Sequence, residues 1–342
     1  MSVTLYPWQG DAWAQWRQLR ARLPHAILFH GPQGIGKTDF AEACAAALLC
    51  ETPSADGHAC GQCDACGWFA QYSHPDYRRV RPEALEDEAG EGEDGEAGES
   101  KKAKTSKPSK EIKIDQVRAL GDFMNISTHR SGMRVVLLHP AEALNTAAAN
   151  SLLKMLEEPP PNTTFLLVSN SLDRLLPTIL SRCRKFALSM PAREAALQWL
   201  KAQDLSDAEG WLAEQGGAPL AALEASQNDS REAMTVLLQQ LAQPAVDAAL
   251  KTADALQKTP VAALVGWQQR WLYDVLSAKL SGTIRYYPRY RKEIERLATR
   301  VETAALLGGI KALGERRAIA DHPLAPKLFI EDMLLDYTAL FS

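Results

Sequence analysis

Residues 31–38 read Gly-Pro-Gln-Gly-Ile-Gly-Lys-Thr, and they follow a short apolar run, Ala-Ile-Leu-Phe, at 26–29. From 37 to 49 the apolar side chains recur at helical spacing. A strand, a glycine-rich loop and a helix in this order predict a phosphate-binding loop, whose backbone N–H groups hold an anion. The alternative is a glycine-rich turn that binds nothing. The nucleotide-binding residues predicted here are Gly31, Pro32, Gln33, Gly34, Ile35, Gly36, Lys37 and Thr38.

The strand expected at 134–138 lacks the acids that usually complete a site of this kind. A P-loop ATPase normally ends this strand with an Asp for Mg²⁺, and in many families with a Glu that activates water; His139 and Pro140 stand there instead. Each such loss commonly costs ~10²–10⁴ in rate. His139 could act as a substitute base or ligand, although a polar cap is the commoner role, and Glu142 is expected to lie too far along the chain. The sequence predicts nucleotide binding with poor hydrolysis.

Four cysteines are clustered as Cys50-x9-Cys60-x2-Cys63-x2-Cys66. In a cytoplasmic chain, clustered cysteines are more often metal ligands than disulfides. Four soft ligands in a compact loop favour a closed, structural, tetrahedral Zn²⁺ site. A C-x2-C-x2-C run is also found in some iron–sulfur proteins, and His58 is a competing ligand.

Composition and charge set broad limits. The 342 residues are 46% hydrophobic and fit two or three domains. No apolar run reaches the roughly 20 residues of a membrane helix, and the start of the chain shows no signal pattern, so a soluble cytoplasmic protein is expected. Residues 83–110 contain nine acids and five lysines, which account for the whole net charge of −4. This polar stretch is predicted to be a disordered insertion.

Alternating strands and helices up to about residue 190 predict a parallel, helix-covered sheet, whereas helices dominate after Pro191. The turn Ser181-Arg182-Cys183 follows the fourth predicted strand. An arginine at a domain edge can reach a neighbour's γ-phosphate. From chemistry alone, Arg182 is more simply a surface charge.

Taken together, these features resemble the clamp-loader branch of the AAA+ ATPases, over nearly the whole chain. The most specific matches are the run at 152–160, the cysteine spacing and Ser-Arg-Cys at 181–183. The stretches that carry the resemblance are Tyr6-Pro7-Trp8-Gln9, residues 25–29, residues 31–38, the four cysteines, His74-Pro75-Asp76, residues 114–118, residues 150–160 (Asn-Ser-Leu-Leu-Lys-Met-Leu-Glu-Glu-Pro-Pro), Leu180-Ser181-Arg182-Cys183, His322-Pro323-Leu324 and Phe329-Ile330-Glu331-Asp332.

The resemblance implies an α/β plus all-α protein. A RecA-like P-loop domain at 1–190 would contain a zinc module at 50–66; a small helical lid would span 191–228 and a helical collar that joins subunits 229–342. Arg182 would be an arginine finger that acts in trans on an adjacent motor ATPase subunit. The implied partners are the motor and delta subunits and, through the assembly, the sliding clamp and primed DNA. The implied cofactors are structural Zn²⁺ and ATP or ADP with Mg²⁺.

Two departures from the motor subunits favour a non-hydrolysing member of the family. The strand end at His139-Pro140 lacks their two acids, and the stretch 216–220 lacks the arginine of their second sensor. No intrinsic catalysis is therefore expected, and the intact Lys37 leaves nucleotide binding open. The alternative is an active P-loop ATPase or kinase that works alone. A zinc-dependent nucleic-acid-binding module with an idle P-loop is a third hypothesis. The basic and aromatic run at 285–292 is compatible with DNA binding or with a basic loop between helices.

Overall fold

The computed structural model describes residues 5–88, 108–125, 128, 132–228, 230–320 and 325–341. The chain divides into two compact units, 1–192 and 193–342. Most of the predicted insertion (89–107) and the stretch 322–324 lie outside the described residues.

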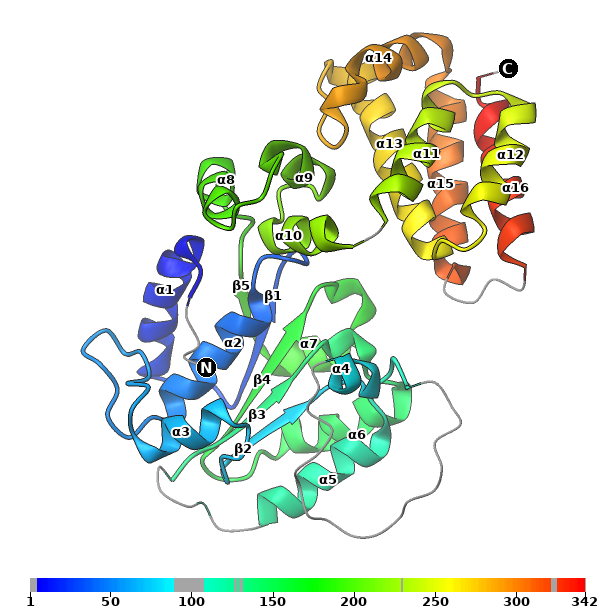
Figure 1. The fold of residues 1–342 in the computed structure, drawn as a ribbon. Helices are drawn as coiled ribbons and strands as arrows, with labels where there is room; N and C mark the ends of the chain where they lie inside the picture. Colours follow the sequence, from blue (N-terminus) through cyan, green and yellow to red (C-terminus); the bar gives the residue numbers. More distant parts are fainter. Residues whose placement is uncertain are drawn as a thin grey trace. The chain divides into compact units, whose positions relative to one another are not determined.

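The first unit is built on a five-stranded parallel sheet with the order β2-β3-β4-β1-β5 (Figure 1). The central strands are apolar on both faces, as expected for a sheet covered by helices on both sides. The strands are β1 (Ala26–His30), β2 (Tyr77–Val80), β3 (Arg134–Leu138), β4 (Thr163–Ser169) and β5 (Arg184–Ala187). The helices of this unit are η1 (Pro7–Gln9), α1 (Gly10–Arg20), α2 (Lys37–Leu49), α3 (Asp64–Ala70), α4 (Glu83–Glu88), α5 (Ile114–Asn125), η2 (Ala141–Ala143), α6 (Thr146–Glu157), η3 (Leu172–Arg174) and α7 (Pro177–Arg182).

Alternate residues of the strands face two different helical layers. Leu28, Val136 and Leu167 pack into one apolar core with residues of α5, α6 and α7. On the opposite face, the ring of Phe29 lies 5.6 Å from that of Phe40 in α2 and 6.2 Å from that of Trp16 in α1, centroid to centroid. Figure 1 shows α1 and α2 on one side of the sheet and α5 and α6 on the other. The parallel, helix-covered sheet predicted from the sequence is confirmed.

Two elements of this unit differ from the sequence-based prediction. The edge strand β5 was not expected, because Arg184 and Lys185 are exposed and Phe186 is the one deeply buried side chain of the strand. Residues 83–88 were assigned to the disordered insertion but form α4. The carboxylate of Glu83 accepts a hydrogen bond from the N–H of Ser109 and pairs with Lys113, so the acidic segment is anchored where it begins.

The second unit is helical throughout its described residues and contains two apolar cores. Its first three helices, α8 (Arg193–Ala202), α9 (Ala208–Glu214) and α10 (Pro219–Gln227), pack around Leu200, Leu212 and Ala222. In the larger core, the indole N–H of Trp271 donates to the hydroxyl of Tyr337, which donates to the carbonyl of Leu241. The helices around this core are α11 (Arg231–Ala242), α12 (Val246–Leu256), α13 (Val261–Ser281), η4 (Pro288–Tyr290), α14 (Arg291–Arg300), α15 (Thr303–Ile319) and α16 (Pro326–Ala339). None of the helices in the described residues is both long enough and apolar enough to cross a membrane.

Candidate functional site

The glycine-rich loop lies between β1 and α2, as predicted, and its glycines are required by close contacts. Gly36 has φ 81°, in the left-handed region that glycine adopts most easily, and a Cβ there would collide with the ring of Tyr6. A Cβ at Gly31 would collide with the carbonyl oxygen of Leu188. The loop can therefore expose its backbone N–H groups only if these positions have no side chain.

Residues 6–9 hold this loop in place from outside. The buried amide of Gln9 donates to the carbonyls of Ile35, at 3.3 Å, and Gly36, at 2.7 Å. The indole N–H of Trp8 also donates to the Ile35 carbonyl, at 3.0 Å. These bonds use carbonyls and leave the N–H groups of the loop for another partner.

Lys37 begins α2 and is buried, with 4% of its surface exposed. Its ammonium group donates to the carbonyl of Pro32 within the same loop, at 2.5 Å. Burial lowers the pKa of Lys37 to about 8, and the negative charge of Glu142 opposes that shift. The lysine is therefore held inside the loop where a phosphate group would lie.

The ends of β3 and β4 complete this edge of the sheet. His139 follows β3, and burial, with the charges of Arg79 and Arg81, lowers its pKa to about 4, so its ring is neutral at pH 7. Glu142 lies near enough to Lys37 to attract its ammonium group. One oxygen of Glu142 accepts the backbone N–H of Asn170, at 3.0 Å; the other is buried and has no hydrogen-bond partner among the described residues.

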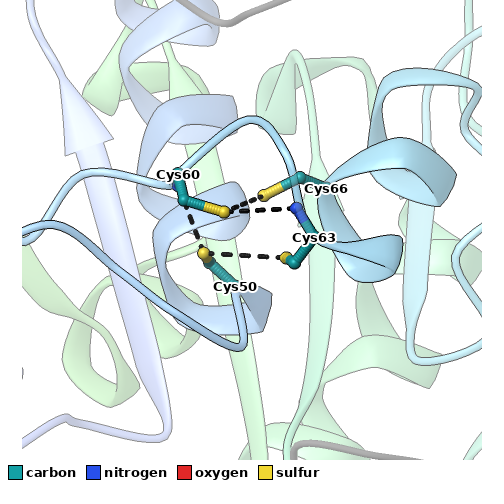
Figure 2. A group of neighbouring side chains, drawn as sticks. All are labelled: Cys50, Cys60, Cys63 and Cys66. Carbon is teal, nitrogen blue, oxygen red and sulfur yellow. Dashed lines mark hydrogen bonds between the residues drawn. The ribbon is translucent and has the colours of Figure 1, made fainter.

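The four cysteines come together beside α2 (Figure 2). Cys50 caps the end of α2, Cys60 and Cys63 lie in the following loop, and Cys66 lies in α3. All four sulfur atoms lie within 4.8 Å of one another, and the Cys50–Cys63 and Cys60–Cys66 sulfur atoms are each 3.9 Å apart. A tetrahedral ion with metal–sulfur bonds of about 2.3 Å needs sulfur–sulfur distances of about 3.8 Å. The set therefore fits a single metal ion.

Hydrogen bonds prepare these sulfur atoms to carry negative charge. Backbone N–H groups of Gln62 and Cys63 donate to the sulfur of Cys60, and the N–H of Cys60 donates to the sulfur of Cys50. A hydrogen bond from Thr52, followed by these N–H groups, lowers the pKa of Cys60 to about 6. Burial raises the pKa of Cys66. Because thiolates are the form that binds metal, an ion would offset the cost of ionising the buried members.

His58, weighed from the sequence as a competing ligand, has another role. Its ring stacks on Trp13 of α1, with centroids 4.3 Å apart and planes 4° apart. The indole N–H of Trp13 donates to the carbonyl of Asp56, at 3.0 Å, and Arg20 donates to that of Gly57. The loop that carries the cysteines is therefore fixed to α1.

Arg182 is the last residue of α7, and a third of its side chain is exposed. Its guanidinium donates to the carboxylate of Glu157, at 2.5 Å, from one terminal nitrogen. The other terminal nitrogen donates to the carbonyl of Thr178, at 3.0 Å, and to the hydroxyl of Ser181. The side chain lies at the surface of its own unit, where these three contacts orient it.

Comparison with known proteins gives this architecture a family. A family profile described as "DNA polymerase III, delta subunit" matches residues 11–192. "DNA polymerase III subunit delta'" of Pseudomonas aeruginosa is 39% identical over 290 residues, which are 81% of this chain and 79% of that protein. The chain belongs to the DNA polymerase III delta' family. The delta' protein of Haemophilus influenzae is 31% identical and covers 98% of this chain and 96% of its own length.

Among solved structures, a gamma subunit-related protein of Thermotoga maritima is similar to this delta' family member at 16% identity. The match covers 96% of this chain and 99% of that chain, with a TM-score of 0.45.

Sequence reasoning missed three residues at the sites of this delta' family member. Asn170 was not singled out, although it directly follows β4 at the edge where parallel strands place their ligand-binding residues. Glu142 was set aside as too displaced to replace the missing acid at the strand end, but its negative charge acts on Lys37. Glu157 was treated only as part of a family motif, and no sequence spacing indicates that it meets Arg182, 25 residues further along the chain.

Proposed function

We propose that this chain is a stator subunit of a clamp loader, which binds nucleotide but does not hydrolyse it. Its relatives are named as subunits of DNA polymerase III, so the partners proposed are the motor ATPase and delta subunits, in the cytoplasm. Through that assembly it would act on the sliding clamp and primed DNA. Residues 1–190 would form a RecA-like AAA+ domain, 191–228 a lid and 229–342 the collar that joins subunits. The separate apolar cores at 196–222 and 234–341 support this division of the second unit.

One observation carries this proposal: a well-formed phosphate loop faces a strand end without catalytic acids. Lys37 is buried in the loop, and Thr38 follows it to help hold Mg²⁺ of ATP or ADP. At the end of β3, His139 is neutral, and Pro140 has no ionisable group. Water therefore has no strand-end carboxylate to activate it. The cysteine set would hold a structural Zn²⁺, since four sulfur ligands leave no open position for catalysis.

The role proposed for Arg182 is that of an arginine finger supplied in trans. Three features allow the guanidinium to reach outward. Arg182 ends α7, its side chain is partly exposed, and it pairs with a single exposed carboxylate. A finger of this kind is worth about 10³–10⁵ in the turnover of the neighbour's site.

The test measures ATP turnover by this chain alone and when it is mixed with the motor subunit. We expect negligible turnover alone. In the mixture, Arg182→Ala should lower the turnover of the adjacent motor site by about 10³-fold or more. Arg182→Lys should also be impaired, because a lysine cannot make the same forked contacts. Arg174→Ala, which changes another exposed arginine of the same unit, is the matched control and should have no effect.

Two outcomes would contradict the proposal. Robust turnover by the isolated chain would support the self-sufficient ATPase instead. Full turnover of the mixture with Arg182→Ala would show that the guanidinium takes no part. A zinc-dependent nucleic-acid module needs no partner subunit, so failure to bind the motor subunit, together with tight DNA binding by the chain alone, would favour that third function.

A further inference from the structure

Glu142 is an acid outside the strand whose negative charge acts on Lys37 of the phosphate loop. We propose that Glu142 supplies the carboxylate for the divalent cation of a bound nucleotide, in place of the acid that is absent from the end of β3. This inference rests on the nucleotide binding proposed above, but not on the role of Arg182.

The backbone around Glu142 fixes the direction of its carboxylate. The residue lies in the short helix η2 (Ala141–Ala143), which directly follows the turn after β3. The N–H of Asn170, at the end of the neighbouring strand β4, donates to one carboxylate oxygen at 3.0 Å. Two neighbouring strand ends thus place this side chain at the edge of the sheet where the loop after β1 also lies.

The second carboxylate oxygen is the one that suggests a ligand. It is buried, and the described residues offer it no hydrogen-bond donor. Leaving a charged acceptor buried without a partner costs more free energy than leaving a neutral one. A cation bound at this oxygen would remove that cost. The carboxylate therefore has one oxygen occupied by the fold and one available for a ligand.

The surrounding charges fit a nucleotide with its cation. Glu142 attracts Lys37, yet the lysine gives its hydrogen bond to the carbonyl of Pro32. The ammonium group is thus bound within the loop and does not pair with the carboxylate of Glu142. Thr38 adds a hydroxyl from the loop side. Mg²⁺ prefers oxygen ligands and keeps several of its waters, so one carboxylate, one hydroxyl and the phosphates are sufficient.

His139 is the competing ligand at this edge. Its Nε2 atom is also buried without a hydrogen-bond partner in the described part of the chain. A hard cation such as Mg²⁺ selects carboxylate over imidazole, whereas Zn²⁺ or Ni²⁺ would bind the ring well. Mg²⁺ is therefore the appropriate ion for the test, because it would bind the carboxylate of Glu142 and not the ring of His139.

The experiment measures ATP binding by calorimetry in Mg²⁺ and in EDTA. For the unaltered chain we expect binding to be tighter in Mg²⁺ than in EDTA. Glu142→Gln keeps an oxygen for the Asn170 N–H, and it should reduce the Mg²⁺-dependent gain by about 10- to 100-fold, the range typical of losing one group that supports a bound metal, while leaving the affinity in EDTA intact. Glu111→Gln, at an exposed acid, should keep the full difference.

Three other results would each decide against part of this proposal or lead to a second variant. A full Mg²⁺ effect in Glu142→Gln overturns this inference and leaves nucleotide binding standing. Absence of ATP binding by the unaltered chain, with or without Mg²⁺, overturns both. If Glu142→Gln fails to fold, Glu142→Asp takes its place: its shorter side chain should reduce the Mg²⁺ effect, and an undiminished effect would count against the proposal.

Discussion

The pairing of Arg182 with Glu157 is a contact that a neighbouring triphosphate can replace at little cost. Glu157 ends α6, where the negative end of the helix dipole disfavours an acid, and Arg182 ends α7, where a cation is favoured. Because both side chains are partly exposed, the pair contributes only ~0–1 kcal/mol. A phosphate offers the guanidinium a stronger, charge-assisted partner.

Glu157→Gln should therefore release Arg182 without harming the fold. We expect the free energy of unfolding to change by less than about 1 kcal/mol. At limiting concentrations of this chain, turnover by the motor subunit should rise by up to about fivefold, the equivalent of ~1 kcal/mol. Titrating the chain into the motor subunit measures this, with Glu158→Gln as the control. A loss of turnover would mean instead that Glu157 holds Arg182 in its working orientation.

Lys37 should make nucleotide binding depend on pH. Its pKa of about 8 in the free chain means that the ammonium form, which binds phosphate, is lost as the pH rises above 8. Bound phosphates stabilise that charged form and raise its pKa, so affinity stays level below pH 8. Above it, the affinity falls by up to about tenfold per pH unit, because binding then requires uptake of a proton.

Affinity for ATP measured at pH 7, 8 and 9 tests this dependence. Lys37→Arg is the informative variant, because arginine stays charged over this range and should show a level profile. An unaltered chain with constant affinity from pH 7 to 9 would contradict the assignment of the titration to Lys37.

Single residues show why local patterns predict some sites better than others. The phosphate loop and the four cysteines are continuous in sequence, and their chemistry follows from residue type and spacing. Glu142 and Asn170 meet only because β3 and β4 are neighbours in the sheet. His58 stacks on Trp13, 45 positions earlier, and no local pattern indicates that contact.

At the scale of elements, the loop between α2 and α3 depends on its four sulfur ligands. Its described residues form no strand, and Trp13, Arg17 and Arg20 of α1 bind it through hydrogen bonds to its carbonyl groups. Without an ion, ionised thiolates less than 5 Å apart would repel one another. A bound metal would thus stabilise both this loop and the short helix α3 that follows Cys63.

Removal of the metal should therefore destabilise the segment 51–70 and leave the stability of the sheet nearly unchanged. After chelation we expect amide exchange at 51–70 to quicken by about 10- to 100-fold, a local loss of roughly 1–3 kcal/mol. Exchange in β1, β3 and β4 should change far less. Mass spectrometry of deuterium uptake measures both regions, and atomic emission should find one zinc per chain. Iron in fresh protein, or less than one zinc per chain, would contradict the zinc assignment. Cys183→Ala is the control, because this cysteine lies outside the set of four, and the variant should keep the metal.

Buried elements could be predicted from the sequence with good bounds, and exposed ones could not. The helix at 37–49 and the strand at 134–138 agree with α2 and β3, since nearly every residue in them is buried. β5 was missed because an edge strand with one buried phenylalanine resembles a loop. α4 was missed because its acids resemble a disordered segment, although Glu83 reaches Ser109 and Lys113.

At the scale of the whole molecule, the two units have separate apolar cores, and both proposed ligands bind the first unit. The proposed nucleotide and zinc sites lie entirely within 1–192. In 193–342, ion pairs link helices across the second unit's two cores. Arg231 pairs with Glu214, at 2.7 Å, and lies over the ring of Trp211, while Arg289 pairs with Asp207.

Heating should therefore unfold the chain in two transitions, of which nucleotide stabilises one. At a concentration 100 times its Kd, Mg-ATP adds about 2.7 kcal/mol to the stability of the unit that binds it. For a unit of this size, each kcal/mol raises Tm by about 2–4 °C, so a shift of about 5–10 °C is expected. Scanning calorimetry measures the shift, and deuterium uptake assigns it to residues 1–192. Lys37→Ala should abolish it, whereas Arg182→Ala should not. A single transition that moves as a whole would mean that the two units unfold together, with an interface strong enough to carry the effect of nucleotide into the helical unit.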